Sequence, residues 1–340
     1  MSKLLYSEIN SILKTAKMNS ERISLTCAPG GENHRGNQLI GRMPIKGEGF
    51  KADDIEKLAN LWRGETKTEI EVLNLNQLSN VDEIMDLGEE HQARVMILRN
   101  FVSREETEQI YSEIAVDSWD SKYLDPNKYR TEIIDGKEVR LRGKVLNKHA
   151  RQNLCYVPGM TQKPEYLEGK GTIIDLKSKS KLNEVISRLR TMIDTGLLEI
   201  GSDTRVEINV VEGNRYFNLK KTGIGYHGDT ERVVVICVTI GGGGNYPMRW
   251  QWFKKNALQG ENMGVSLNDG DVYIMSEKAV GADWKSSSIY TLRHAAGCNK
   301  YISVDKWIKR AAAKKEKKNA QKKLVVQKKP KKSLKFYSED

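Results

Sequence analysis

Residues 209–232 read NVVEGNRYFNLKKTGIGYHGDTER, a run of short extended segments broken by glycine. Near its end His227 and Asp229 are two residues apart, so on an extended chain their side chains point the same way. Another histidine, His294, follows 67 residues later in a second extended segment. Two imidazoles and a carboxylate can hold one face of an iron(II) ion and leave positions open for O₂ and an oxidisable co-substrate. The pattern therefore predicts a metal site, although H-x-D alone is also common around buried, hydrogen-bonded histidines.

The rest of the chain alternates between helical and extended patterns. A capping box at Ser103 and Glu106 predicts a helix, residues 121–150 predict a hairpin that turns at Asp135-Gly136, and residues 180–198 predict an amphipathic helix. Further on, short strands separated by turns indicate a sandwich or barrel. We expect these strands at residues 206–211, 233–240, 248–253, 271–275, 288–293 and 300–304. The sequence thus predicts an α+β protein.

The charge of the chain is concentrated at its end. The net charge is +11, and residues 306–340 contain 14 Lys or Arg but only 3 Asp or Glu, so the preceding 305 residues are formally neutral. A lysine-rich run of this kind is usually disordered and solvated. It is equally suited to contact a polyanion or to act as a nuclear address.

Cysteines and hydropathy limit the class of protein. The four cysteines, Cys27, Cys155, Cys237 and Cys298, are scattered without a C-x-x-C pair, which predicts neither a zinc knuckle nor disulfides. No apolar run approaches the roughly 18 residues of a membrane span. We expect an intracellular protein of the nucleus or cytoplasm, neither secreted nor membrane-bound, and a monomer.

Several further motifs occur in a fixed order. The first two are the entry-helix stretch from Phe101 to Glu106 and the segment that runs from Gly143-Lys144 through Arg151 to Tyr156. Next come Asn214-x-Tyr216, about ten residues ahead of the H-x-D pair, and an L-x-x-G-D-x-x-x-M-S stretch, residues 267–276, ahead of His294. This ordered set resembles the AlkB family of iron(II)- and 2-oxoglutarate-dependent dioxygenases over about residues 94–306.

The resemblance implies a fold and a set of functional residues. It implies an AlkB-like dioxygenase domain over residues 91–306, in which a double-stranded β-helix (jelly roll) spans about residues 160–306 and is flanked by helices. An N-terminal region of unknown role (1–90) precedes this domain and a disordered basic tail (307–340) follows it. Iron(II) would be held by His227, Asp229 and His294. Asn214 and Tyr216 would bind 2-oxoglutarate, although turn and core packing explains both equally well. Lys144, Arg151 and Tyr156 would lie over the target base, and Trp284, in a loop ahead of the distal histidine, is the better candidate for substrate contact than the tryptophans of 248–253.

The chain departs from the family at one point. Family members carry R-x-N-x-x-x-x-R after the distal histidine, where this chain has Lys300, Ile302 and, one position before the second arginine, Lys306. Lys300 and Lys306 remain candidates to bind the co-substrate, because a cation has to neutralise the distal carboxylate. The replacement also leaves open a different co-substrate, or another anchor such as Arg293 or Arg232.

The resulting hypothesis is an enzyme that oxidises a methyl group on a base of DNA or RNA, using iron(II), 2-oxoglutarate and O₂. Its reaction would be oxidative demethylation or hydroxylation, as in DNA repair or DNA modification. The target base would come from a single strand or be flipped out of a duplex. Three alternatives stay open: a 5-methylpyrimidine hydroxylase with a different co-substrate, a protein hydroxylase or demethylase with the same iron site, and a nucleic-acid-binding module without catalysis.

Overall fold

The computed structural model describes residues 3–34, 37–43, 45–66, 68–313 and 316, with the backbone alone for residues 3–11. The chain divides into two compact units, Met1–Ile302 and Ser303–Asp340. In the second unit residues 305–313 are helical. The helices of the first unit are α1 (Lys3–Ser20), α2 (Ala52–Glu65), α3 (Asp82–Met85), α4 (Arg104–Ile114), α5 (Ser180–Glu199), α6 (Glu277–Val280) and α7 (Asn299–Ile302).

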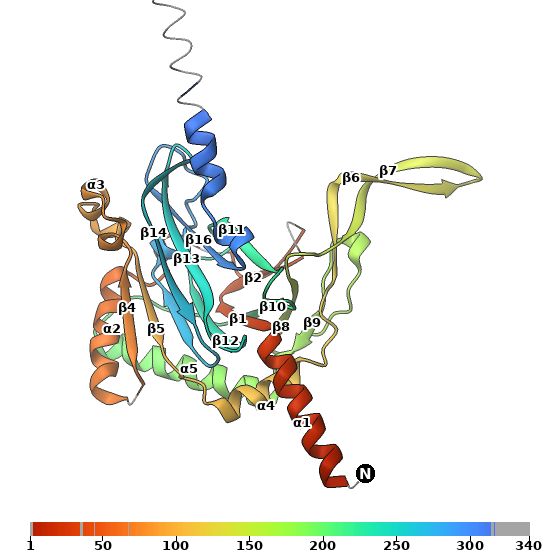
Figure 1. Cartoon of the computed structure of the whole chain (residues 1–340), viewed down its shortest axis with the longest axis horizontal. Coiled ribbons are helices and arrows are strands. Elements are labelled where there is room, and N and C mark those ends of the chain that lie inside the picture. The colour runs from red at the N-terminus through yellow and green to blue at the C-terminus, as the bar shows by residue number, and fades with distance from the viewer. Residues whose placement is uncertain (1–2, 35–36, 44, 67, 314–315, 317–340) are drawn as a thin grey trace, which may run out of the picture. The chain divides into compact units, whose positions relative to one another are not determined.

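The first unit is built on an eight-stranded sheet in the order β4-β5-β15-β12-β1-β10-β8-β9. Its strands are β4 (Ile70–Asn74), β5 (Arg94–Leu98), β15 (Val272–Met275), β12 (Val235–Gly241), β1 (Arg22–Ala28), β10 (Val210–Tyr216), β8 (Gln152–Val157) and β9 (Ile173–Asp175). All neighbours are antiparallel except β8 and β9. The first strand of the chain therefore lies in the middle of the sheet, paired with β10 on one side and β12 on the other (Figure 1).

A smaller antiparallel sheet faces the large one (Figure 1). Its order is β11-β16-β13-β14, with bounds β11 (Gly223–His227), β16 (Thr291–Gly297), β13 (Tyr246–Lys254) and β14 (Ala257–Leu267). From β10 onward the chain passes repeatedly between the two sheets: β10 is in the large sheet, β11 in the small, β12 in the large, β13 and β14 in the small, β15 in the large and β16 in the small.

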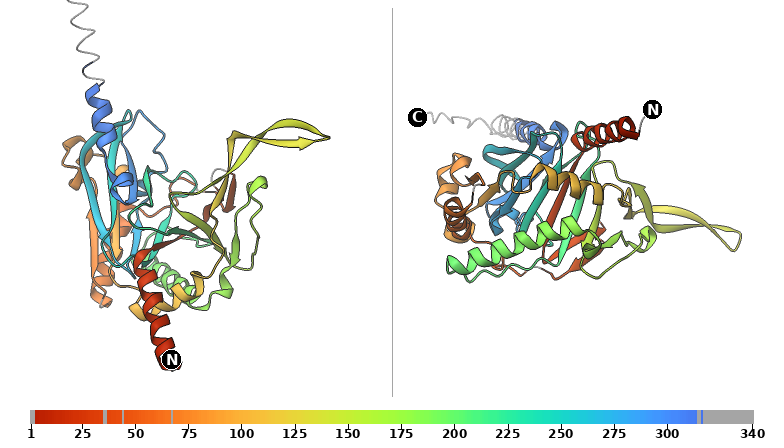
Figure 2. Two further views of the ribbon diagram at one scale, coloured as in Figure 1. Left: turned by 45° about the vertical axis from the view of Figure 1, so that its right-hand side comes forward. Right: turned by 90° about the horizontal axis from the view of Figure 1, so that it is seen from below.

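Two cores hold these layers together. One lies between the large sheet and helices α2, α4 and α5, and it includes Leu189 of α5 and Ile110 of α4. These two helices lie across the outer face of the sheet when the unit is seen from below (Figure 2). The other core lies between the two sheets and contains Trp250 and Trp252, both fully buried. Burial of these tryptophans confirms the prediction that they are core residues rather than base-stacking ones.

A long hairpin leaves the body of this unit. Strands β6 (Lys122–Ile134) and β7 (Lys137–Asn147) pair only with each other and project away from the sheets (Figures 1 and 2). Two further short strands, β2 (Gly30–His34) and β3 (Gln38–Gly41), form a second two-stranded sheet. The hairpin turns at Asp135 and Gly136, which both have positive φ, as the sequence predicts.

Most of the predicted elements are present, and the mixed α+β class is confirmed. The capping box forms, since Ser103 Oγ accepts from the Glu106 amide and Glu106 accepts from the Ser103 amide. The strand predicted at 300–304 is wrong, because residues 299–302 form the short helix α7. The predicted boundary near residue 90 falls inside the first unit, between two paired strands of one sheet.

Three smaller expectations concern the cysteines, membrane-spanning helices and the basic tail. The four cysteines are unpaired, as predicted. Among the described residues, no helix has the length and apolarity needed to cross a membrane. The disorder predicted for the basic tail concerns mostly residues 314–315 and 317–340, which lie outside the described residues.

Candidate metal centre

His227, Asp229 and His294 converge between the two sheets. His227 is the last residue of β11, Asp229 follows two residues later, and His294 lies opposite His227 in the paired strand β16. One possible ligand atom from each residue lies within 4.8 Å of those of the other two. Asp229 Oδ1 is 3.4 Å from His227 Nε2 and 3.9 Å from His294 Nε2. The three groups predicted from sequence are therefore brought together.

The surroundings keep the imidazoles neutral and orient one of them. The Nδ1 atom of His227 lies 2.8 Å from the carbonyl oxygen of Gly225 and 3.0 Å from that of His294, so Nδ1 carries the proton and donates it. The unprotonated Nε2 then faces Asp229. Burial lowers the pKa of His227, and burial together with the neighbouring His227 lowers the pKa of His294 to about 3. Both rings thus have the protonation state that metal ligation requires.

Asp229 is held as a carboxylate. Burial alone would raise its pKa, but the positive charge of the neighbouring Arg232 opposes that effect and the pKa is lowered. Arg232 Nε lies 3.7 Å from Asp229 Oδ2, and the same guanidinium contacts Glu212 and Glu231. Arg232 is therefore occupied by three carboxylates, which argues against the alternative in which it anchors a co-substrate.

The residue between the two H-x-D ligands has to be glycine. A Cβ at Gly228 would overlap the carbonyl oxygen of Gly281 and lie 2.9 Å from Cβ of Trp284. The Asp229 amide donates to the Val280 carbonyl oxygen at 3.2 Å in the same place. The ligand loop is thus packed directly on the loop that follows α6.

The three ligand groups line a cavity of about 810 Å³ between the two sheets. Its inner wall is buried and includes Tyr246, Met248 and Tyr273, whereas its rim includes the exposed residues His149 and Lys285. Polar side chains from the large sheet also reach it, namely Ser24, Thr26, Glu212, Asn214 and Tyr216.

Four more of the predicted site residues line this cavity: Asn214, Tyr216, Arg151 and Trp284. Arg151 Nε donates to Asn214 Oδ1 at 2.6 Å, and Asn214 Nδ2 donates to Glu212 Oε1 at 2.8 Å. Tyr216 is nearly buried. Their presence in one cavity agrees with their predicted nearness to the metal ligands, and their roles stay predictions.

Lys300 is the main correction among the predicted residues. It is exposed on α7, stacks on the ring of the adjacent Tyr301 at 5.5 Å and does not line the cavity. The physical reason is that β1 already occupies the place between β10 and β12, so the segment after β16 cannot pair there. It turns instead into α7, fixed by Tyr226 Oη, which donates to the carbonyl oxygen of Ile302 at 2.9 Å.

Three other predicted positions, Tyr156, Lys144 and Arg293, do not line the cavity. Tyr156 is fully buried in the helix-side core and donates to Asp117 Oδ2 at 2.9 Å, because alternation along β8 turns it away from the cavity. Lys144 is exposed on the hairpin. Lys306 belongs to the second unit, which is described by itself. Arg293, the other alternative anchor, stacks on the rings of Phe253 and Trp284 and does not line the cavity.

Sequence reasoning missed the cavity-lining residues of β1. These are Ser24 and Thr26. Together with Arg22, which lies on the same face, they alternate with Ile23 and Leu25, which is the period of a strand. A strand that is polar on one face and apolar on the other marks either a solvated edge or the wall of an internal site. This signal was available, but nothing local placed the segment in the centre of a sheet.

The donor set fits an iron-type divalent metal better than a structural zinc site. It offers two nitrogens from paired strands of the small sheet and one oxygen from the loop after β11, and the cavity leaves the remaining directions open. Nδ1 of His294 is buried with no hydrogen-bond partner among the described residues. The two Nε2 atoms and Asp229 Oδ1 would hold the metal.

Comparison with known proteins gives one clear relationship. No family model matches the chain. It is 32% identical over 283 residues to "Uncharacterized protein R156" of Acanthamoeba polyphaga mimivirus, an alignment that covers 83% of this chain and 98% of the viral protein. Similarity of this extent over nearly the whole viral protein means that the chain belongs to the same family as that mimivirus protein.

Proposed function

We propose that the protein is an iron(II)- and 2-oxoglutarate-dependent dioxygenase that oxidises a methyl group on a nucleic-acid base. The observation that carries the proposal is the convergence of His227, Asp229 and His294 at one cavity between two antiparallel sheets. Two nitrogens and one carboxylate on one side of a metal, with open positions beside them, suit a metal that binds O₂ and a co-substrate together.

The proposal includes a finer description of the fold. The chain passes back and forth between the two facing sheets from β10 to β16, as a double-stranded β-helix does. In such a roll the last strand returns to the large sheet between the first and third. Here β1 takes that place between β10 and β12. The roll is then complete, with its closing strand drawn from the beginning of the chain.

The bound iron would supply oxidation of a C–H bond: one atom of O₂ goes to the methyl carbon and the other to the succinate formed as 2-oxoglutarate loses CO₂. The residues of this chain position the reactants. Asn214 and Arg151 form a hydrogen-bonded pair on the cavity wall and can hold polar groups of the co-substrate. Trp284 borders the cavity and offers a ring face for a flat substrate.

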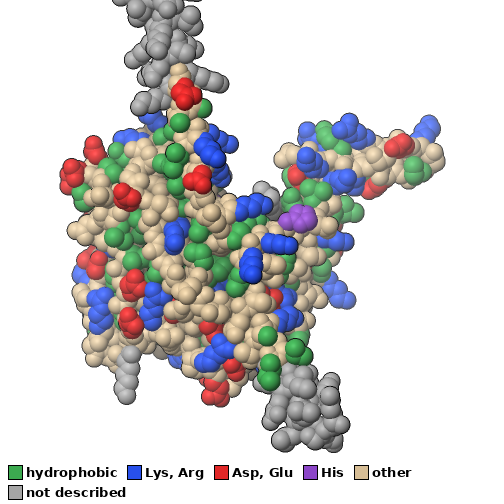
Figure 3. All heavy atoms as spheres, viewed as in Figure 1, with side chains coloured by type: hydrophobic (Ala, Val, Ile, Leu, Met, Phe, Trp, Pro, Cys, Tyr) green, Lys and Arg blue, Asp and Glu red, His purple; other side chains and the backbone are tan. Residues whose placement is uncertain are grey.

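Two features support nucleic acid as the substrate. The cavity has room for a single flipped nucleotide beside the co-substrate. Its lining includes Lys148 and Arg151, and the exposed His149 and Lys285 lie on its rim. The adjoining hairpin, residues 122–147, contains seven Lys or Arg and four Asp or Glu. Lys and Arg side chains are frequent along it on the visible face (Figure 3). A projecting basic arm next to the mouth of a cavity suits contact with phosphates.

The test is turnover with a defined metal. The full-length protein is loaded with iron(II) without O₂ and then given O₂ and either methylated single- and double-stranded DNA and RNA oligonucleotides or methylated peptides, with and without 2-oxoglutarate. Mass spectrometry reads both the base and the succinate. We expect loss of a methyl group, or gain of one oxygen, only when 2-oxoglutarate is present, and neither with Asp229→Ala. Product formation without 2-oxoglutarate would refute the co-substrate, and oxidation of peptides alone would refute the substrate.

A further inference from the structure

Arg22 is a buried cation on the cavity face of the large sheet. It is the first residue of β1, has no exposed surface, and lies directly opposite Tyr216 of β10, while Ser24 lies opposite Asn214. Directly opposite residues of antiparallel strands point to the same face. Ser24, Asn214 and Tyr216 line the cavity, so Arg22 lies on the face of the sheet that meets it. Arg22 itself is one layer behind the cavity wall, in contact with the lining residues Tyr246 and Leu267.

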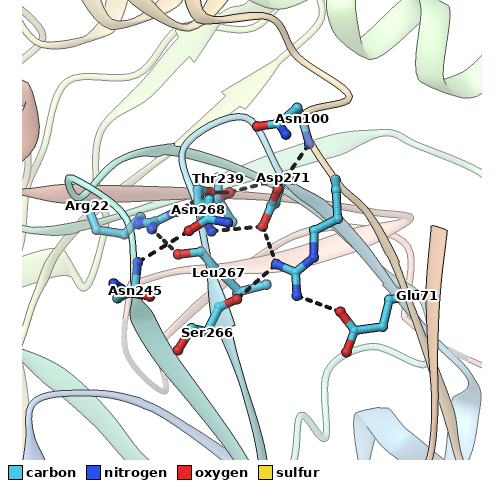
Figure 4. Close-up of polar contacts among 10 residues, drawn as sticks. Arg22, Glu71, Asn100, Thr239, Asn245, Ser266, Leu267, Asn268 and Asp271 are labelled. Atoms are coloured by element: carbon cyan, nitrogen blue, oxygen red, sulfur yellow. Dashed lines mark hydrogen bonds and ion pairs between the residues drawn. The ribbon is translucent and has the colours of Figure 1, made fainter. Parts of the chain in front are cut away.

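The charge of Arg22 is not matched. Its two terminal nitrogens donate to the carbonyl oxygens of Asn268 at 3.0 Å and Leu267 at 2.7 Å, and its Nε has no partner among the described residues. The nearest carboxylates are used elsewhere. Asp271 pairs with Arg99 at 2.6 Å and accepts from the Asn268 and Asn100 amides (Figure 4), and Asp269 binds Arg104 and Thr107.

Other enclosed arginines of this unit are better satisfied. Arg232 contacts Glu212, and Arg215 pairs with Glu21 at 2.9 Å. Arg293 has no ion pair, but it keeps some exposure and stacks between two aromatic rings. A fully buried guanidinium that bonds only to carbonyl oxygens is costly unless an anion joins it. Burial accordingly lowers the pKa of Arg22.

A second unsatisfied group lies beside this charge. The Tyr246 hydroxyl is buried without a partner in the described part of the chain, and its ring centre is 5.1 Å from the guanidinium carbon of Arg22. Tyr246 itself lines the cavity. Along β13 it is four residues from Trp250, the strand partner of His294, which is about 13 Å at the usual rise. A five-carbon dicarboxylate on the metal together with a long arginine side chain can bridge that separation.

We infer that Arg22, with the Tyr246 hydroxyl, binds the distal carboxylate of the dicarboxylate co-substrate, in place of Lys300. The inference rests on the proposed function. It names the cation for the distal carboxylate, which the segment after β16 does not supply. The anchor comes from the N-terminal end of the chain because β1, and not that segment, lies between β10 and β12. Arg22 would supply the charge and Tyr246 one further hydrogen bond.

The experiment compares two ligands of equal length. Calorimetric titration of the Mn(II)-loaded full-length protein measures 2-oxoglutarate and 2-oxopentanoate, which lacks only the distal carboxylate. We expect the wild type to prefer 2-oxoglutarate by on the order of 100-fold, as for other buried charge pairs. Arg22→Met should remove the preference and leave the affinity for 2-oxopentanoate within a few-fold. The exposed Lys300→Met is the matched control and should keep the wild-type preference.

Two milder variants guard against a folding defect. Arg22→Lys keeps the charge and should retain part of the preference for 2-oxoglutarate. Tyr246→Phe removes only the hydroxyl and should lower the affinity for 2-oxoglutarate by about 10-fold. An unchanged preference in Arg22→Met, or in both milder variants if Arg22→Met does not fold, overturns the inference. So does loss of the preference in Lys300→Met or Arg151→Met alone. If the wild type binds neither ligand, both the proposed co-substrate and this inference are refuted. If the wild type binds 2-oxoglutarate tightly and substitution of Arg22 leaves that affinity unchanged, only the inference is refuted.

Discussion

The glycine between the two H-x-D ligands gives a sharp test of the metal centre. We expect Gly228→Ala to damage both stability and metal binding, and Gly225→Ala to damage neither. The two glycines flank His227 in the same segment, and neither has a positive φ, so alanine fits both backbones. They differ in their surroundings: a Cβ at Gly228 overlaps the Gly281 carbonyl oxygen, whereas a Cβ at Gly225 meets only the Tyr301 carbonyl oxygen, at 3.9 Å.

The expected magnitude follows from that overlap. To relieve it, the ligand loop and the loop after α6 have to separate by roughly 1 Å, and overpacking of this kind costs about 1–3 kcal/mol. That loss lowers the melting temperature by about 2–4 °C for each kcal/mol in a unit of this size. Metal–ligand distances can vary by only about 0.2 Å. Displacing Asp229 should therefore lower the affinity for the metal by at least about 10- to 100-fold.

The assay combines unfolding of the metal-free protein with Mn(II) titration followed by calorimetry. Gly225→Ala should match the wild type in both measurements, because its new methyl group enters open space and the Gly225 carbonyl oxygen still accepts from His227. Equal metal affinities for the two alanine variants would show that the contact between Gly228 and Gly281 does not position Asp229, and would refute the reasoning.

Three other outcomes are expected. Asp271→Ala should cost about 3–5 kcal/mol in urea unfolding because it removes the buried carboxylate that accepts from Arg99 and from the Asn100 and Asn268 amides, whereas Glu71→Ala, at the more exposed end of the same arginine, should cost less than about 1 kcal/mol; similar losses would contradict this. Burial lowers the pKa of His294 to about 3, so the unfolded chain binds a proton that the folded metal-free protein refuses. Stability should therefore fall as the pH drops from about 6.5 toward 3, and less steeply in His294→Gln when followed by circular dichroism; an equal slope would argue against the burial of that ring. Removal of residues 311–340 should weaken nucleic-acid binding and flatten its salt dependence with turnover on short substrates unchanged, and an unaltered salt slope would return the tail to a solubilising role.

Local patterns predicted local features well. The two-residue spacing of His227 and Asp229 puts both side chains on one side of an extended chain whatever the rest of the fold does. The capping box at Ser103 and the turn at Asp135 likewise depend on a few neighbouring residues. Such features are determined by interactions within a turn or a strand, which is why they can be recognised without knowing the topology.

The errors came from strand order, which is not a local property. The basic segment around Lys300 was predicted to form the strand after the distal histidine, but the place between β10 and β12 is filled by β1, from the beginning of the chain. Tyr156 was placed over the substrate because of its position in a motif, although alternation along β8 directs it to the helix-side core. Which face of a strand meets the cavity depends on its neighbours, and no neighbour of β8 could be identified from sequence.

The central position of β1 also changes how the first ninety residues are understood. All seven of its residues pair with β10 and six of them pair with β12, so both flanking strands depend on it for their hydrogen bonds. Without β1 the large sheet would have two unpaired edges in its middle, and buried backbone groups without partners are strongly destabilising. The N-terminal region is therefore a structural part of the two-sheet body and not an addition to it. If Arg22 anchors the co-substrate as inferred, the same seven residues that close the sheet also complete the site, so that folding of the two-sheet body and formation of the binding pocket are one event.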